Sequence, residues 1–103
     1  MKIRAFICLF CAAAVVAAGA DASAGKAVYA KRCQSCHGAG GEGNANVAKM
    51  LKATMKPLAD SSVQSKSDDE LKKEITNGVG KMKPVKLTDA EATDVVAYVK
   101  SLK

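Results

Sequence analysis

Hydrophobic residues recur at helical spacing in the C-terminal third of the chain, behind two recognisable helix starts. Residues 67–70 (Ser-Asp-Asp-Glu) and 88–91 (Thr-Asp-Ala-Glu) both have the form of a capping box. Leu71 and Ile75 follow the first box four residues apart, and Asn77-Gly78 supplies a stop. Behind the second box lies an apolar stripe of Ala92, Val95, Val96, Val99 and Leu102. These patterns predict two helices.

Two further helices are predicted earlier in the chain from weaker patterns. One covers residues 23–33 with Ser23 as N-cap, since Gly25, Tyr29 and Cys33 fall four apart on one face. The other covers residues 46–56 and ends at Pro57. Residues 58–66 are polar and Ser-rich, which indicates an ordered loop. No alternating apolar run suggests a strand, so we predict an all-α domain of about four helices.

The N-terminus has the three parts of a secretory signal. Lys2 and Arg4 precede an uncharged stretch, residues 5–20, that ends in the small residues Ala18-Gly19-Ala20. This stretch is shorter than the ~20 apolar residues that span a bilayer. We expect residues 1–20 to be cleaved off, leaving residues 21–103 as the folded domain. Cleavage after Ala22 and a retained N-terminal anchor are the alternatives.

Removal of this leader changes the composition of the folded part. Of 103 residues 83 remain, and the net charge falls from +6 to +4 as Lys2 and Arg4 leave. Phe6 and Phe10 leave as well, so the mature chain has only two aromatic residues and no Trp. A domain of ~80 residues is near the size at which a core needs a disulfide, metal or cofactor. We therefore expect another group to fill part of its core.

Residues 33–37 read Cys-Gln-Ser-Cys-His, the C-x-x-C-H pattern of covalent c-type haem attachment. Cys33 and Cys36, three apart on one helical turn, can reach the two vinyl positions on one porphyrin edge. His37 then lies beneath the ring with an imidazole nitrogen directed at the iron. The sequence thus predicts one covalently bound haem.

Other chemistries are less compatible with the chain. A thioredoxin-like dithiol needs a βαβ context, and a disulfide between Cys33 and Cys36 closes too short a loop to stabilise much. A zinc site would lack a fourth ligand in the mature chain, because His37 is the only histidine. Residues 38–43 match G-x-G-x-x-G, but a dinucleotide site requires that motif between a strand and a helix. Those glycines more plausibly let backbone pass close to the haem.

The sixth iron ligand must be a side chain other than histidine. Met50, Met55 and Met82 are the candidates in the mature chain. Met50 and Met55 lie on a predicted helix, where a core-filling role is usual. Met82 lies between the two clearest helices in a basic loop stiffened by Pro84, and insertion onto a ligand explains an apolar side chain there. Met82 is our predicted ligand, with Met55 as the alternative.

At this point the chain resembles the small monohaem class I cytochromes c. The resemblance rests on residues 25–29, the motif at 33–38, the loop at 78–84 and the Ala97-Tyr98-Val99 helix. It implies helices around one haem, with the first and last crossing near Gly25, Tyr29 and Tyr98. It also implies His37 and Met82 as axial ligands. The chain departs from common family patterns in two places: Lys83 separates Met82 from Pro84, and no proline soon after Gly38 offers a carbonyl to His37 Nδ1.

The resemblance implies a one-electron carrier outside the cytoplasm, and we expect it in the periplasm. Two filled axial positions and the absence of a second histidine argue against catalysis. The alternatives are a haem enzyme or gas-binding module with a labile Met82, and a subunit of a larger oxidoreductase. We expect redox-protein partners, no nucleic acid, and no stable membrane insertion after leader cleavage.

Charge is segregated along the mature chain. Residues 44–59 and 78–88 each carry three lysines and no acid, whereas residues 60–77 carry five acids against three lysines. The lysines of these two basic segments are Lys49, Lys52, Lys56, Lys81, Lys83 and Lys86. If Met82 binds the iron, the second group lies near the haem and predicts a docking face for acidic partners. An ordinary solvated surface is the alternative.

Overall fold

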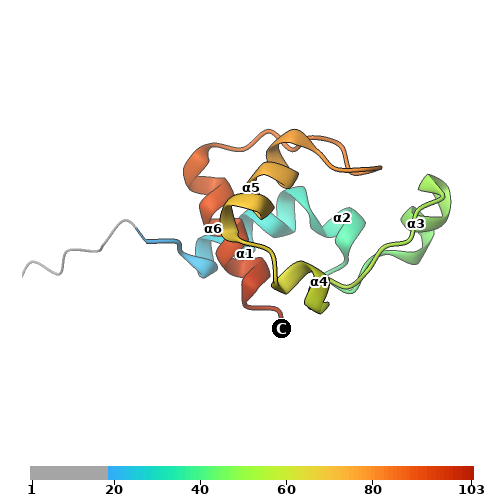
Figure 1. Cartoon of the computed structure of the whole chain (residues 1–103), viewed down its shortest axis with the longest axis horizontal. Helices are drawn as coiled ribbons and strands as arrows, with labels where there is room; N and C mark the ends of the chain where they lie inside the picture. Colours follow the sequence, from blue (N-terminus) through green and yellow to red (C-terminus); the bar gives the residue numbers. More distant parts are fainter. Residues whose placement is uncertain (1–18) are drawn as a thin grey trace, which may run out of the picture.

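The computed structural model describes residues 19–103, so the predicted leader lies almost wholly outside the described residues. The described chain contains four helices of seven or more residues and two single turns (Figure 1). They are α1 (Ala22–Arg32), α2 (Gln34–His37), α3 (Ala45–Leu51), α4 (Ser61–Gln64), α5 (Asp68–Asn77) and α6 (Asp89–Lys100). From residue 19 onward there is no strand, only an isolated bridge between Val79 and Met82. The predicted all-α class is confirmed. None of the helices in this range is long and apolar enough to cross a membrane.

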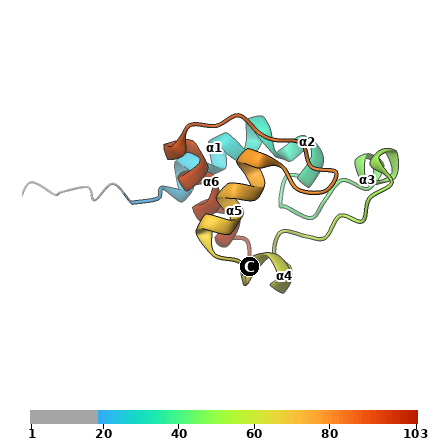
Figure 2. The same ribbon diagram turned by 45° about the horizontal axis from the view of Figure 1, so that its top comes forward.

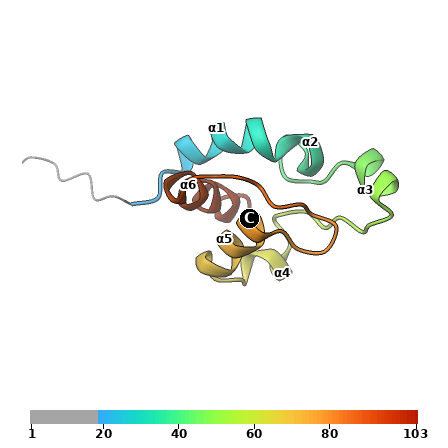
Figure 3. The same cartoon turned by 90° about the horizontal axis from the view of Figure 1, so that it is seen from above.

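The first and last helices form the most extensive helix pair of the domain (Figures 1 and 3). They approach closely at Gly25, where an added Cβ would lie 1.9 Å from the backbone oxygen of Asp94. One turn further along α1, the rings of Tyr29 and Tyr98 meet with their centroids 5.1 Å apart and their planes inclined at 58°. The predicted crossing near these residues is confirmed.

The hydrophobic core is small and lies where α1, α5 and α6 meet. Helix α6 supplies most of it, because four of the five residues of its predicted apolar stripe are buried. Leu102, the fifth, is half-buried in the turn after the helix. The buried apolar residues of the described chain are Tyr29, Leu71, Ala92, Val95, Val96 and Val99.

Side-chain caps account for where the helices begin. Thr88 and Glu91 form the full reciprocal capping box predicted for α6. At α5 Ser67 accepts a hydrogen bond from the Glu70 N–H, which is the forward half of the box. Helix α1 begins before the predicted Ser23 cap, because the Asp21 carboxylate accepts from the first free backbone N–H groups of the helix.

The prediction for residues 46–56 was wrong about the helix end. Helix α3 stops at Leu51, because Lys52 adopts a left-handed conformation with φ of 51°. Residues 53–56 are therefore not helical, and Met55 does not lie on a helix. The predicted loop at 58–66 contains α4, which is tied to the core by Gln64. Its side-chain amide donates to the carbonyls of Leu58 at 2.8 Å and Val99 at 2.9 Å.

The end of the molecule that carries α3 is organised differently from the core. In Figures 1 to 3 this helix stands away from the α1–α6 pair. No residue between 42 and 70 is buried. The segment is instead anchored by backbone hydrogen bonds, such as the 2.8 Å bond from Leu58 N–H to the Gly41 carbonyl.

Replacing Gly25 with alanine tests the α1–α6 contact. Helix propensity alone favours the change by roughly 0.5–1 kcal/mol. Overlap of the new methyl group with the Asp94 carbonyl should instead push the helices apart, so we expect a net loss of roughly 1–3 kcal/mol. Denaturant unfolding measures this, and a more stable Gly25→Ala protein would contradict the packing described.

Candidate haem-attachment site

The two cysteines of the motif lie on one helical turn, Cys33 between α1 and α2 and Cys36 within α2. Cys33 ends α1 and begins α2, with its N–H bonded to the Tyr29 carbonyl at 2.9 Å. The His37 N–H bonds back to the Cys33 carbonyl at 2.9 Å, so both thiols and the imidazole share a single turn. Cys33 is half-buried and Cys36 exposed, and both are free thiols. Burial raises the pKa of the Cys33 thiol.

His37 has the chemistry of a ligand held ready for a metal. Its Nδ1 is buried and has no hydrogen-bond partner among residues 19–103. Burial lowers the pKa of the imidazole, which favours the neutral form that binds metal ions. A buried polar nitrogen without a partner is costly, and no contact within residues 19–103 offsets that cost. A half-buried imidazole with an unpaired nitrogen, beside two free thiols, fits a c-type haem.

The chain leaves this turn through Gly38, whose φ of +81° only glycine adopts easily. Two backbone bonds then fold the chain back onto the motif: Gly43 N–H to the His37 carbonyl at 2.6 Å, and Asn44 N–H to the Cys36 carbonyl at 2.9 Å. Residues 38–44 form turns and bends that follow a helix, so the context required for dinucleotide binding is not present. Gly38 is needed for its backbone conformation.

Tyr29 connects this turn to the core, a role that the sequence analysis missed. Its ring is 1% exposed, and its hydroxyl donates to the Gly38 carbonyl at 2.5 Å. Burial, and then the nearby Cys33 thiol, raises the pKa of Tyr29 to about 12. The sequence did contain a sign of this role: Tyr29 is one of only two aromatic residues in the mature chain, and it shares a helix face with Cys33.

Met82 lies in the loop between α5 and α6. A tight turn holds it, with Val79 N–H bonded to the Met82 carbonyl at 3.0 Å and Met82 N–H to the Val79 carbonyl at 2.9 Å. Gly78 allows this turn, because a Cβ there would lie 2.7 Å from the Met82 oxygen. The Met82 side chain is half-buried, whereas Lys81 and Lys83 on either side are exposed.

The same loop is tied to the end of α1 just before the motif. The Arg32 guanidinium donates to the Lys86 carbonyl at 2.9 Å, a contact that the sequence did not predict. In all three views the tip of the loop lies at the same end of the molecule as α2 and α3 (Figures 1 to 3). The structure thus gathers Cys33, Cys36 and His37 in one turn and brings the Met82 loop to that end from a separate element.

The prediction that Met50 and Met55 are core-filling residues on a helix was wrong for both. Met50 is 80% exposed on α3. Met55 is half-buried in the segment after α3, where a Cβ on Gly43 would contact its Cγ at 3.5 Å. Met55 therefore packs beside the chain that leaves the motif.

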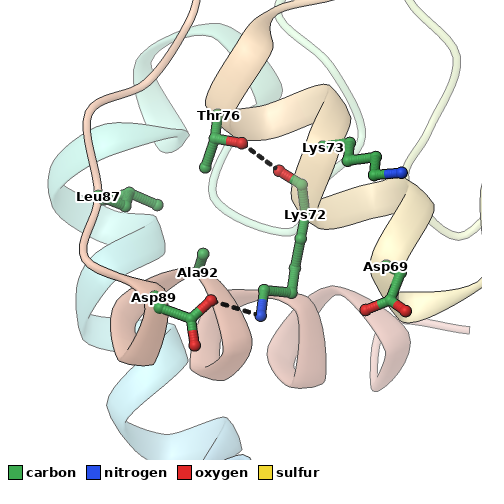
Figure 4. Close-up of a pocket in the computed structure, with 7 residues that line it drawn as sticks. All are labelled: Asp69, Lys72, Lys73, Thr76, Leu87, Asp89 and Ala92. Carbon is green, nitrogen blue, oxygen red and sulfur yellow. Dashed lines mark hydrogen bonds and ion pairs between the residues drawn. The ribbon is translucent and has the colours of Figure 1, made fainter.

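Two surface hollows lie away from the predicted haem site. One, of about 400 Å³, is crossed by the ion pair of Lys72 with Asp89 at 2.7 Å (Figure 4). It is lined by Asp69, Lys72, Lys73, Thr76, Leu87, Asp89 and Ala92. The other, of about 350 Å³, lies between α1 and the segment before α6. Neither contains a residue of the predicted haem site. Within residues 19–103 no three His, Cys, Asp or Glu side chains are grouped to hold a metal ion by themselves.

Comparisons with known proteins agree with the predicted covalent haem. Residues 20–99 match the family described as cytochrome c oxidase, cbb3-type, subunit III. The chain is 41% identical over 85 residues to cytochrome c6 of Picosynechococcus sp. (strain ATCC 27264 / PCC 7002 / PR-6), covering 78% of this chain and 72% of that protein. It is 37% identical over 86 residues to cytochrome c6 of Synechocystis sp. (strain ATCC 27184 / PCC 6803 / Kazusa), covering 81% and 67%. Among solved structures, the KustC0563 c-type cytochrome is similar with a TM-score of 0.66 and 30% identity, over 77% of this chain and 96% of that one.

Replacing Tyr29 with phenylalanine tests its bond to the turn. We expect a loss of about 1 kcal/mol near neutral pH, because the Gly38 carbonyl loses its donor. The folded pKa of Tyr29 lies above its unfolded value of 10.0, so this group contributes stability below pH 10 that is lost as the pH rises towards about 12. The rise corresponds to at most about 2.7 kcal/mol. The difference between the unfolding free energies of the two proteins should therefore shrink over this range. A pH-independent difference would show that Tyr29 does not titrate as described.

Proposed function

Because the chain belongs to the small monohaem cytochrome c family, whose cofactor is a covalently bound c-type haem, we propose that it is an exported one-electron carrier. Cys33 and Cys36 attach the haem, and His37 and Met82 are its axial ligands. When bound, the haem supplies reversible one-electron chemistry at its iron. The observation that carries this proposal is the turn that joins two free thiols to an imidazole whose buried Nδ1 has no partner within residues 19–103.

The chain's own residues favour electron transfer over catalysis. A thioether such as Met82 is a soft neutral ligand, and His/Met ligation raises the reduction potential. If His37 and Met82 both bound the iron, no ligand position would remain open for oxygen or peroxide. The mature chain offers no second histidine as general acid or base. These features support an outer-sphere carrier.

Export follows from the leader pattern of residues 1–20, with residues 21–103 as the haem domain and the periplasm as the expected compartment. Covalent haem attachment at a C-x-x-C-H motif is compatible with that compartment. A subunit of a larger oxidoreductase is the second candidate, favoured by the description of the matching family. Co-purification with other subunits in high salt would support that candidate, and a free monomeric carrier would oppose it. Rapid carbon monoxide binding to the reduced protein would instead favour a gas-binding module or enzyme.

The exposed lysines support a basic docking surface. Lys81, Lys83 and Lys86 are exposed in the loop that carries Met82. Helix α3 and the residues after it lie at the same end of the molecule (Figure 2). That segment adds three more exposed lysines, Lys49, Lys52 and Lys56. We propose that this face docks acidic redox partners, since complementary charge accelerates encounter.

Replacing Met82 with alanine tests the ligand assignment. We expect loss of the sulfur–iron charge-transfer band in the near-infrared spectrum of the oxidised protein, together with a lower midpoint potential. The purified wild-type spectrum in both oxidation states is the reference and also reports the haem type and its attachment.

Met55→Ala is the matched control for that experiment. It should keep the band and mainly lose stability, by roughly 2–5 kcal/mol if a cavity remains. Folding is checked for both variants alongside the spectrum. Loss of the band in Met55→Ala and its retention in Met82→Ala would reverse the assignment.

Ionic strength tests the docking surface. Electron transfer to an anionic small-molecule oxidant should slow as salt rises, because the Debye length falls from ~10 Å at 0.1 M to ~3 Å at 1 M. Lys81→Glu combined with Lys83→Glu should slow it several-fold further at low salt. Stopped-flow kinetics measure both effects.

Lys26→Glu combined with Lys103→Glu is the charge-matched control, since both lysines are exposed and lie outside the two basic segments. It should slow the reaction less than the loop variant does. If the two double variants had equal effects, or if the rate did not depend on salt, the docking surface would be rejected and the lysines would form an ordinary solvated surface.

A further inference from the structure

The start of the folded domain contacts the last helix through a backbone nitrogen. The N–H of Asp21 donates to Asp94 Oδ1 at 2.9 Å, joining residues 73 positions apart in the sequence. Asp94 is half-buried on α6, and its backbone oxygen faces Gly25 where α1 packs closely against α6. The nitrogen of Asp21 therefore lies where the two main helices are held together.

The Asp94 carboxylate has no cationic side chain as a partner. The salt bridges among residues 19–103 are Lys66 with Glu74 and Lys72 with Asp89. The Asp94 carboxylate therefore accepts a hydrogen bond from a neutral backbone amide, the N–H of Asp21. A positive charge on that nitrogen would turn the contact into a charge-assisted bond, which is shorter and stronger than a neutral one.

We propose that removal of the leader between Ala20 and Asp21 creates an ion pair between the new α-ammonium group of Asp21 and the carboxylate of Asp94. In this step a signal peptidase adds water across the Ala20–Asp21 amide. The C–N bond breaks, the water oxygen stays on the Ala20 carboxyl group, and the nitrogen is protonated. An α-amino group has an ordinary pKa of about 7.7–8.0, so it is mostly charged near neutral pH. No oxidant or reductant is involved.

This charge needs compensation, because the positive end of the α1 dipole lies at the same place. Two carboxylates supply it. The side chain of Asp21 accepts from Ser23 N–H at 2.9 Å and Ala24 N–H at 3.2 Å, and Asp94 faces the new ammonium directly. Cleavage thus leaves a charged terminus inside a cluster of opposite charge.

The geometry also distinguishes the two candidate cleavage positions. Cleavage after Ala22 would remove Asp21, and with it both the helix cap and the contact to Asp94. Its new terminus would be the Ser23 nitrogen. In the uncleaved chain the Ser23 N–H donates to the Asp21 side chain, and cleavage after Ala22 would remove that acceptor. Only a terminus at Asp21 keeps the α1 cap and completes the pair.

The test is a double-mutant cycle on the exported, haem-loaded protein. One axis is Asp94→Asn, and the other is a Ser-Gly insertion between Ala20 and Asp21, which moves the ammonium away but keeps the Asp21 N–H. Intact mass establishes the first residue of each protein. Denaturant unfolding then gives the coupling between the two changes.

We expect Asp94→Asn to raise the unfolding equilibrium constant about two- to fivefold more with the native terminus than with the insertion, the scale of exposed ion pairs. The coupling should shrink in 1 M salt, and Asp94→Glu should keep most of it. Asp89→Asn is the matched control, because this α6 carboxylate pairs with Lys72 and should not couple to the terminus.

The inference rests on the proposed export, but the two fail differently. A wild-type mass that still includes residues 1–20 would contradict export and the pair together. A mature protein beginning at Ser23 would leave the carrier function intact and overturn the pair. Equal effects of Asp94→Asn in both backgrounds would also overturn it, whatever the spectrum of the haem shows.

Discussion

The close packing of α1 against α6 positions the candidate site, because the face of α1 that meets α6 leads directly into the turn that carries His37. Gly25 allows the two backbones to approach, and Tyr29 is then buried one turn further on. The Tyr29 carbonyl accepts from Cys33 and its hydroxyl donates to Gly38. One core residue thus bonds to both ends of the turn, and this links the packing of the helix pair to the turn that carries the imidazole.

Features of the fold that depend on local chemistry were predictable, and those that depend on a single backbone conformation were not. The Thr88–Glu91 box and the stripe behind it define α6, since caps and periodicity are encoded in neighbouring residues. The end of α3 is different. Lysine has no preference for the left-handed conformation that Lys52 adopts, so the sequence pointed to Pro57 as the next breaker and made the helix five residues too long.

The candidate site also has features that the sequence predicted and features that it did not. Cys33, Cys36 and His37 are close in sequence, and a single turn is enough to bring their side chains together. Two contacts that support this turn, from Tyr29 to Gly38 and from Arg32 to Lys86, could not be predicted. Each joins a side chain to a carbonyl whose position is set by tertiary packing, 9 and 54 residues away. Residue types alone do not reveal such bonds, because every carbonyl in the chain is an equivalent acceptor.

The domain is also uneven in how its parts are stabilised, and this bears on what a bound haem would do. Among residues 19–103, helices α1, α5 and α6 supply every buried apolar side chain, whereas α3, residues 52–60 and the Met82 loop supply none. Backbone hydrogen bonds hold these latter segments, and each adds only about 1 kcal/mol net. A haem attached at Cys33 and Cys36 and ligated by Met82 would offer them a large apolar surface to bury. Attachment and ligation would therefore add most of their stability to the α3 and Met82 segments, and least to the helix core, which is already packed around Tyr29.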